Sequence, residues 1–228
     1  MPVTEKGITP MLLNRHNLSL TALCSKDPAC VNLNGLHITP THTEATDGHC
    51  AGRVTLPVCD TEDFPPCGGV VSSSEQLKPC LVPREAIERL AKSIPTKAAA
   101  RMPVLGHVRV DVVATNANNH FRAVTTDMQT VTPIEAQKAE GTFPDMEQVF
   151  PTDTPYITVG FNAELMAKVL KVAGAFNGRN HAVKLDIFLT AKEKEAGDGL
   201  SQSIPMRLTA TDVETGQTGT FLVMPMRL

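Results

Sequence analysis

The strongest constraint on the fold of this chain is a pattern that occurs twice. In residues 83–95 apolar side chains recur at helical spacing, and a proline stands at each end of the run. In residues 162–174 the same spacing recurs between an asparagine that can cap a helix and a glycine that can end one. Both patterns predict an amphipathic helix of similar length.

Strand-like alternation follows each predicted helix. After the first, valines alternate with charged residues at 108–112, a turn rich in asparagine stands at 116–119, and the alternation returns at 121–125. After the second, strands are predicted at 183–189, 206–210 and 221–226.

The sequence of the N-terminal third predicts the same unit, with a less regular pattern. A short helix is expected at 11–23, and strands are expected at 31–39 and 44–56. The repeat therefore predicts an α+β protein with antiparallel sheets, built from repeated βαβββ half-units.

The composition limits the class of partner and the compartment. The net charge is −3, so any contact with DNA has to come from a local basic patch. No apolar run reaches the roughly 18 residues of a membrane span, and residues 1–6 carry no secretory signal. We expect a cytoplasmic protein with no membrane partner.

All six cysteines lie in the first 80 residues, and none forms a Cys-x-x-Cys pair. Reduced thiols are the expected state in the cytoplasm. A zinc site drawn from Cys50, Cys59, Cys67 and His49 stays an alternative with weak spacing.

Residues 221–228 form an apolar run of β type that contains Met224, Pro225 and Met226. Because proline donates no hydrogen bond to a sheet, this run is expected at a sheet edge. Flexible methionines there suit an adaptable groove for another chain. The alternative is a terminal strand that only fills core.

Six short motifs, in this order, make the sequence resemble one family, the bacterial DNA polymerase III β subunit, or sliding clamp. They are Leu33-Asn34-Gly35, Thr46-Asp47-Gly48-His49, Val82-Pro83-Arg84, Phe143-Pro144-Asp145 followed by Val149, Gly160-Phe161-Asn162, and Val223-Met224-Pro225-Met226-Arg227-Leu228. The resemblance implies a DNA-clamp-like fold.

The resemblance also implies a domain plan. Residues 1–152 resemble the second domain of a clamp, with half-units at about 8–76 and 77–152, and residues 153–228 resemble the second half of its third domain. The first domain and half of the third have no counterpart, so the chain resembles a shortened member of the family.

The peptide pocket of the family, which receives polymerase and clamp-loader peptides, corresponds to ten positions here. They are Leu33, Thr46, Gly48, His49, Pro144, Val149, Leu222, Met224, Pro225 and Met226. Cys50 and Gln148 stand where the family commonly has arginine, so the polar rim is expected to differ. Without the resemblance, the plainer explanation of Asp47 and His49 is a turn pair that satisfies local backbone groups.

Clamps line their pore with helices, so the resemblance implies non-specific contacts with double-stranded DNA from helical lysines and arginines. The candidates are Lys92, Lys97, Arg101, Lys168, Lys171 and Arg179. Solvated helix faces are the plainer explanation for these charges. A homo-oligomer is expected if the chain closes a ring.

The resemblance implies a processivity factor or docking platform for short peptide motifs in DNA replication or repair. The alternative is a clamp-derived peptide-binding module that forms no ring and competes for clamp-binding proteins. A metal hydrolase built on His42, Glu44, Asp47 and His49 is the third class, but no motif of a metal or nucleophile site accompanies these residues. We therefore expect no catalysis, no cofactor and no metal.

Overall fold

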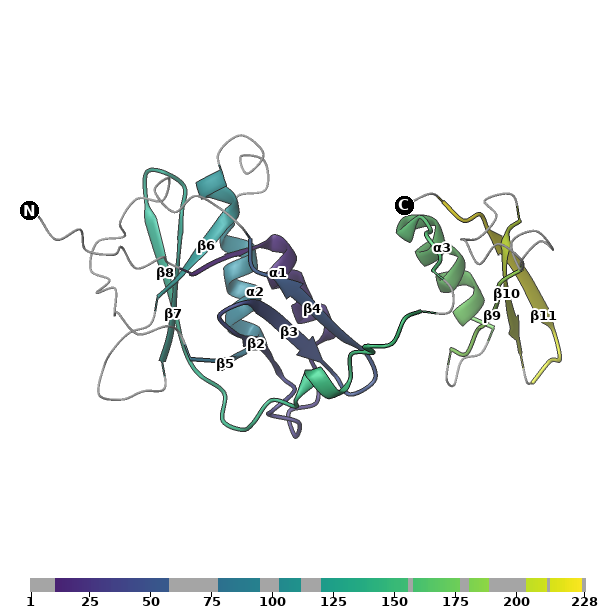
Figure 1. The fold of residues 1–228 in the computed structure, drawn as a ribbon, viewed down its shortest axis with the longest axis horizontal. Coiled ribbons are helices and arrows are strands. Elements are labelled where there is room, and N and C mark those ends of the chain that lie inside the picture. The colour runs from purple at the N-terminus through teal and green to yellow at the C-terminus, as the bar shows by residue number, and fades with distance from the viewer. Residues whose placement is uncertain are drawn as a thin grey trace, which may run out of the picture. The chain divides into compact units, whose positions relative to one another are not determined.

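The computed structural model describes residues 11–57, 78–94, 103–111, 120–155, 158–176, 181–188, 204–212 and 214–226. The chain divides into two compact units, Met1–Val149 and Phe150–Leu228 (Figure 1). The sequence placed this boundary after residue 152. Within the described residues, no helix has both the length and the apolar character needed to cross a membrane.

The first unit contains two copies of one element order, strand, helix and three strands. The first copy consists of β1 (Met11–Asn14), α1 (Arg15–Ser19), the 3-10 helix η1 (Leu20–Leu23), β2 (Gly35–Ile38), β3 (His42–Thr46) and β4 (Ala51–Thr55). The second consists of β5 (Cys80–Pro83), α2 (Arg84–Ser93), the 3-10 helix η3 (Pro103–Gly106), β6 (His107–Asp111), β7 (His120–Thr126) and β8 (Val131–Gln137). The 3-10 helix η4 (Met146–Gln148) follows the second copy.

The two copies exchange their first strands. The sheets run in the orders β1-β6-β7-β8 and β4-β3-β2-β5. Strand β1 therefore pairs antiparallel with β6 of the other half, and β5 pairs antiparallel with β2. Each half-unit thus completes the sheet of the other.

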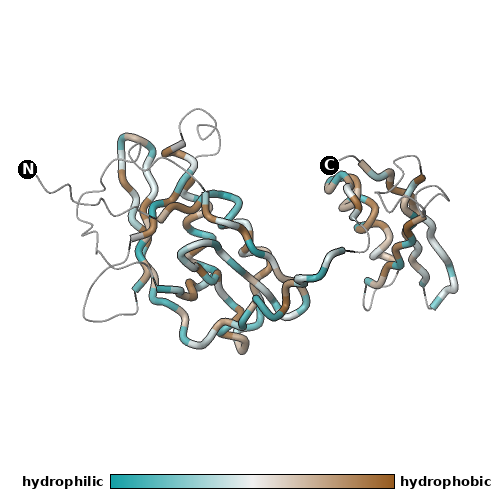
Figure 2. Tube along the Cα trace, viewed as in Figure 1, coloured by the Kyte–Doolittle hydropathy of each residue, from teal (hydrophilic) through white to brown (hydrophobic). Residues whose placement is uncertain are grey.

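The helices of the two halves contribute to one core. Helix α1 contacts α2, and the core cluster joins residues of both helices to residues of both sheets. Ile87 and Leu90 of α2 are fully buried there. Burying side chains of this size stabilises a fold by about 1.5–3 kcal/mol each. Figure 2 shows hydrophobic and hydrophilic residues interspersed along the trace of this unit.

In its described residues, the second unit holds one helix followed by three strands, the same order as the later part of each copy in the first unit. Its elements are α3 (Ala163–Gly174), β9 (Lys184–Asp186), β10 (Met206–Thr211) and β11 (Thr218–Val223). Its sheet has the order β11-β10-β9, and Figure 1 shows α3 beside this sheet. A small core joins Met166 of α3 to the sheet residues Met206, Leu208 and Val223.

The structure confirms the predicted α+β class with antiparallel sheets. It differs from the sequence prediction in several elements. Residues Met11–Asn14, expected in a helix, form β1 because they pair with β6. Residues 44–56 form two strands around a turn. Strand β8 was not predicted, since Pro133 interrupts its pattern, and it lies at a sheet edge, where proline is tolerated.

Candidate peptide-binding surfaces

The turn between β3 and β4 is held by two side chains of the Thr46-Asp47-Gly48-His49 motif. The Asp47 carboxylate accepts hydrogen bonds from the backbone N–H groups of Cys50 at 2.8 Å and His49 at 2.9 Å. These bonds lower the pKa of Asp47 from 3.8 to about 2. The Thr46 hydroxyl donates to the Cys50 carbonyl and accepts from the Gly48 N–H. Gly48 has a φ of +91°, which glycine adopts without strain.

The same turn recurs between β7 and β8. There the Asp127 carboxylate accepts from the backbone N–H groups of Gln129 and Thr130, and the Thr126 hydroxyl donates to the Thr130 carbonyl. A third Thr-Asp pair stands at the hairpin between β10 and β11, where the Asp212 carboxylate accepts from nearby backbone N–H groups. Thr46 and Asp47 therefore have a structural role in their turn; the local alternative predicted this role for Asp47 and His49, and the structure shows it for the Asp47 side chain.

Two side chains beside this turn stay available to a partner. An added Cβ on Gly48 would lie 4.0 Å from Cδ1 of Leu33, so Leu33 is next to the turn. Leu33 is half-buried and His49 is exposed. Together they present an apolar side chain and an imidazole at one corner of the first unit.

The segment that carries Pro144 and Val149 lies on the outer face of the sheet that contains this turn. The Phe143 ring stacks on His37 of β2, with ring centroids 4.6 Å apart. Glu147 of η4 forms an ion pair with Arg53 of β4, with 2.7 Å between the nitrogen and the oxygen. These contacts fix the segment and leave Pro144 and Val149 exposed. Sequence reasoning missed the roles of Phe143 and Arg53, because each depends on a contact distant in the sequence.

Glu44 is the buried centre of this face. Its carboxylate contacts His37 at 3.0 Å, His42 at 3.2 Å and Arg53 at 2.6 Å. Burial alone would raise the pKa of Glu44, but the hydrogen bonds from His37 and Arg53 outweigh it and lower the pKa below its ordinary value.

Two residues of the hydrolase alternative therefore have structural partners. The Glu44 carboxylate accepts a hydrogen bond from Arg53, and the Asp47 carboxylate accepts one from the backbone of its own turn. No group of three or more metal-binding side chains occurs in the part of the chain that the structure describes. Cys50 is exposed and its thiol lies 3.3 Å from the Asp47 carboxylate. Cys59 and Cys67, the other thiols of the zinc alternative, lie outside the described residues.

In the second unit, large apolar side chains are exposed at alternate positions along the end of β11. The exposed fractions are 60% for Leu222, 50% for Met224 and 48% for Met226. Alternate residues of an extended chain share one face, so these three side chains form an apolar stripe. Val223 and Pro225 between them are buried, and Pro225 forms a β-bridge with Phe161. Pro225 therefore positions the stripe and offers little surface of its own.

The helical cations fall at matching positions of α2 and α3. Lys92 is the ninth residue of α2 and Lys171 the ninth of α3, while Lys168 is the sixth of α3 and Arg89 the sixth of α2. All four are exposed. Aligning the two helices at their first residues would have identified Arg89, which sequence reasoning missed. Lys97, Arg101 and Arg179 lie outside the described residues.

No protein-family model and no curated protein matches the sequence. Solved structures do match the fold. The β subunit from DNA polymerase of Streptococcus pyogenes has a TM-score of 0.62 at 13% identity, covering 100% of this chain and 52% of that one. DNA polymerase III subunit beta from Borrelia burgdorferi, solved with a natural product, has a TM-score of 0.61 at 14% identity and coverages of 98% and 50%.

The sliding clamp from Pseudomonas aeruginosa, bound to griselimycin, matches with a TM-score of 0.57 at 18% identity, covering 99% of this chain and 53% of that chain. The chain thus spans about half the length of the clamps it matches. From end to end, it has the shortened fold of a bacterial DNA polymerase III β sliding clamp.

Proposed function

We propose that this protein is a non-catalytic docking platform, which binds short peptide motifs of polymerase-type or clamp-loader partners and works in DNA replication or repair as a processivity factor. With such partners, the protein would act in the cytoplasm. The observation that carries the proposal is the exposed apolar stripe of Leu222, Met224 and Met226 on a clamp fold.

The chemistry of the stripe supports a peptide ligand. Thioether side chains adapt to apolar partners of different shape, and large exposed apolar groups mark interaction surfaces. Leu33, His49, Pro144 and Val149 of the first unit add accessible apolar groups and one imidazole. An extended peptide that bears a glutamine and a Leu-Phe pair suits these exposed groups, since the Leu-Phe pair can contact apolar side chains and the glutamine can bind polar groups.

Calorimetric titration of that peptide into the full chain tests the proposal. We expect roughly micromolar affinity, about −8 kcal/mol. Met224→Ala should cost on the order of 1–3 kcal/mol of binding, because it removes a desolvated anchor. Met128→Ala, which truncates a methionine of similar exposure in the first unit, should bind like the wild type.

Wild-type binding weaker than millimolar, or equal losses in the two variants, would overturn the peptide site. A double-mutant cycle between Val149→Ala and Met224→Ala then asks whether both sets of residues bind one peptide. A lower affinity at one 1:1 site in each single variant, with a larger loss in the double variant, supports a single ligand; a loss in only one of the single variants contradicts it.

Binding of double-stranded DNA belongs to the same proposal. The matched cations of α2 and α3 support non-specific contacts with phosphates. Such binding weakens steeply with salt, and Lys168→Glu together with Lys171→Glu should reduce it for every DNA sequence. Retention on closed circular DNA, with loss after linearisation, distinguishes a ring that encircles DNA.

The second candidate is a peptide-binding module that forms no ring and competes for clamp-binding proteins. The observation that favours it is that the exposed stripe of Leu222, Met224 and Met226 can bind a peptide without a closed ring. Peptide binding without retention on circular DNA would support this function over the processivity factor.

A further inference from the structure

The two sheets of the first unit share one pairing rule. In each half, one residue stands two positions before the helix. This residue pairs with the second residue of a strand in the other half, namely the first strand that follows the helix there. Leu13, before α1, is paired with Val108 of β6, and Val82, before α2, is paired with Leu36 of β2. All four side chains are completely buried. This apolar pair therefore seals the junction between two half-units.

The second unit has the same two positions with no partner strand among the described residues. Phe161 stands two positions before α3, and Leu185 is the second residue of β9. Phe161 is 45% exposed and Leu185 is 48% exposed. Strand β9 ends its sheet, and within the described ranges nothing pairs with its outer edge. Both members of the sealing pair are thus present and uncovered.

The extended segment before α3, which forms the isolated bridge between Phe161 and Pro225, is also placed as in the first unit. The Met226 N–H donates to the Gly160 carbonyl at 2.9 Å, as the Ala139 N–H donates to the Leu81 carbonyl at 2.9 Å. Gly160 and Leu81 occupy the same position, three residues before their helices. Successive residues of a strand direct their backbone groups to opposite edges, so those of Phe161 point away from Met226. In the first unit, that edge of β5 pairs with β2.

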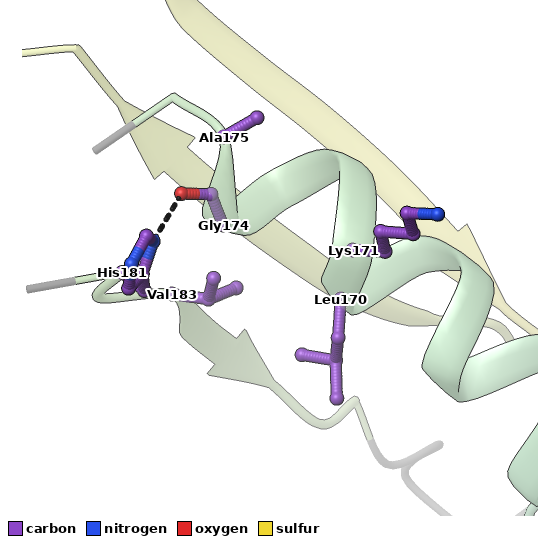
Figure 3. A pocket seen from close by; sticks show the side chains of 6 residues that line it. All are labelled: Leu170, Lys171, Gly174, Ala175, His181 and Val183. Carbon is purple, nitrogen blue, oxygen red and sulfur yellow. Dashed lines mark hydrogen bonds between the residues drawn. The ribbon is translucent and has the colours of Figure 1, made fainter. Parts of the chain in front are cut away.

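Helix α3 exposes the apolar groups that such a junction would cover. Leu165 is the third residue of α3 and is 50% exposed, whereas Ala86, the third residue of α2, is buried. Figure 3 shows Leu170 and Val183 on the walls of an open pocket of about 690 Å³ between α3 and the segment that enters β9. The hydrogen bond between His181 and the Gly174 carbonyl closes one end of the pocket.

We propose that the second unit pairs with the second unit of another copy of this chain, through the edge of β9 and the exposed face of α3. The register of the first unit fixes the pairs: Asn162, Phe161 and Gly160 would lie opposite Lys184, Leu185 and Asp186 of the second copy. A two-fold axis makes the contact self-complementary, since each copy gives one member of the sealing pair and receives the other. This pairing requires neither peptide nor DNA, so it stands apart from the proposed function.

A second copy is the occupant that fits best, because the half-units of the first unit bury each other by this same exchange of first strands. When two half-units pair, the edge of β9 and the edge of the segment before α3 both gain hydrogen-bond partners. The same pairing covers Phe161, Leu185 and Leu165. An exposed strand edge beside large apolar groups is otherwise open to irregular association.

A disulfide between copies tests the register. Paired residues of antiparallel strands have Cα atoms about 4.5–5.5 Å apart, which suits a disulfide. The double variant Phe161→Cys/Leu185→Cys of the full chain should form a covalent dimer on mild oxidation. Mixing ¹⁵N-labelled and unlabelled protein should give a cross-linked peptide of hybrid mass. The natural cysteines all lie in the first 80 residues, so peptides with positions 161 and 185 are free of them.

The matched control is Phe161→Cys/Thr220→Cys, which places the second thiol on β11 at the other edge of the same sheet. It should give no such cross-link. A second variant pair, Leu185→Lys and Val31→Lys, places a charge at two sites that are each 48% exposed. Leu185→Lys should weaken self-association by about tenfold or more, a loss of at least about 1.4 kcal/mol, and Val31→Lys should leave it unchanged. Absence of the 161–185 cross-link, or equal association of the two lysine variants, would overturn the proposal.

Discussion

The two units of this protein use one half-unit in two different ways. In the first unit, two copies exchange their first strands and bury the apolar pairs Leu13–Val108 and Val82–Leu36. In the second unit, a single copy leaves Phe161 and Leu185 about half exposed at the same positions. The pattern of strands and helix is therefore enough to form a half-unit. Burial of the sealing pair, in contrast, requires a second half-unit.

The hairpin turns also repeat from one half-unit to the next. Each half-unit has a Thr-Asp pair at the turn between its last two strands, and in each the carboxylate binds backbone N–H groups of its turn. The turn is therefore part of the repeated unit. What distinguishes the first turn is Gly48 and the exposed His49 beside Leu33.

The largest effect should come from truncating the sealing pairs in the two units. Leu36→Ala should destabilise the first unit by about 2–5 kcal/mol, because it leaves a cavity in a fully packed core. Leu185→Ala, measured at a concentration where the chain is monomeric, should change stability by no more than about 0.5 kcal/mol. Denaturant unfolding with hydrogen exchange assigned to each unit measures both. Similar losses at the two sites would mean that Leu185 is already packed within its own chain.

A smaller effect should come from the helix caps. The Asn162 side chain accepts hydrogen bonds from the Glu164 and Leu165 N–H groups at 2.9 and 3.1 Å, as Asn14 does for α1. Asn162→Ala should cost about 1 kcal/mol, the usual value of a side-chain cap. Faster amide exchange along α3, with exchange in α2 unchanged, is the expected result. Exchange that is accelerated equally in both helices would contradict the separation into two units.

The smallest effect should be the titration of Asp47. Its pKa is lowered from 3.8 to about 2 by hydrogen bonds from the Cys50 and His49 backbone. A carboxylate with a lowered folded pKa stabilises the turn above pH 3.8, and this contribution is lost as the pH falls through about 2. Carboxyl NMR titration should find a pKa near 2 for Asp47, and the pKa of Asp127 lowered in the same way. An ordinary value for Asp47 would show that its turn is open in solution.

Sequence patterns predicted α2 and α3 well, since periodicity and end signals agree in both. The pattern at 83–95 gave α2 (Arg84–Ser93), and the pattern at 162–174 gave α3 (Ala163–Gly174). Strand β1 could not be predicted, because residues Met11–Asn14 are extended only through pairing with the distant β6. Tertiary pairing overrides local preference in such short segments.

The candidate site was predictable in part. The motifs identified the turn at Thr46 and the methionines at Met224 and Met226, whose exposure follows from period-two alternation. The buried position of Pro225, in contrast, depends on its bridge with Phe161, which no local pattern encodes. Whether the two sets of residues bind one peptide stays a proposal for the calorimetric test.

If a second copy of the chain completes the half-unit of the second unit, the protein must dimerise in solution. Light scattering of the full chain over a dilution series from high to low micromolar concentration tests it most directly. We expect a molar mass that rises with concentration from 24.5 kDa toward twice that value and levels off there. A mass that stays at 24.5 kDa up to high micromolar concentration, or that grows past the dimer without limit, would contradict it.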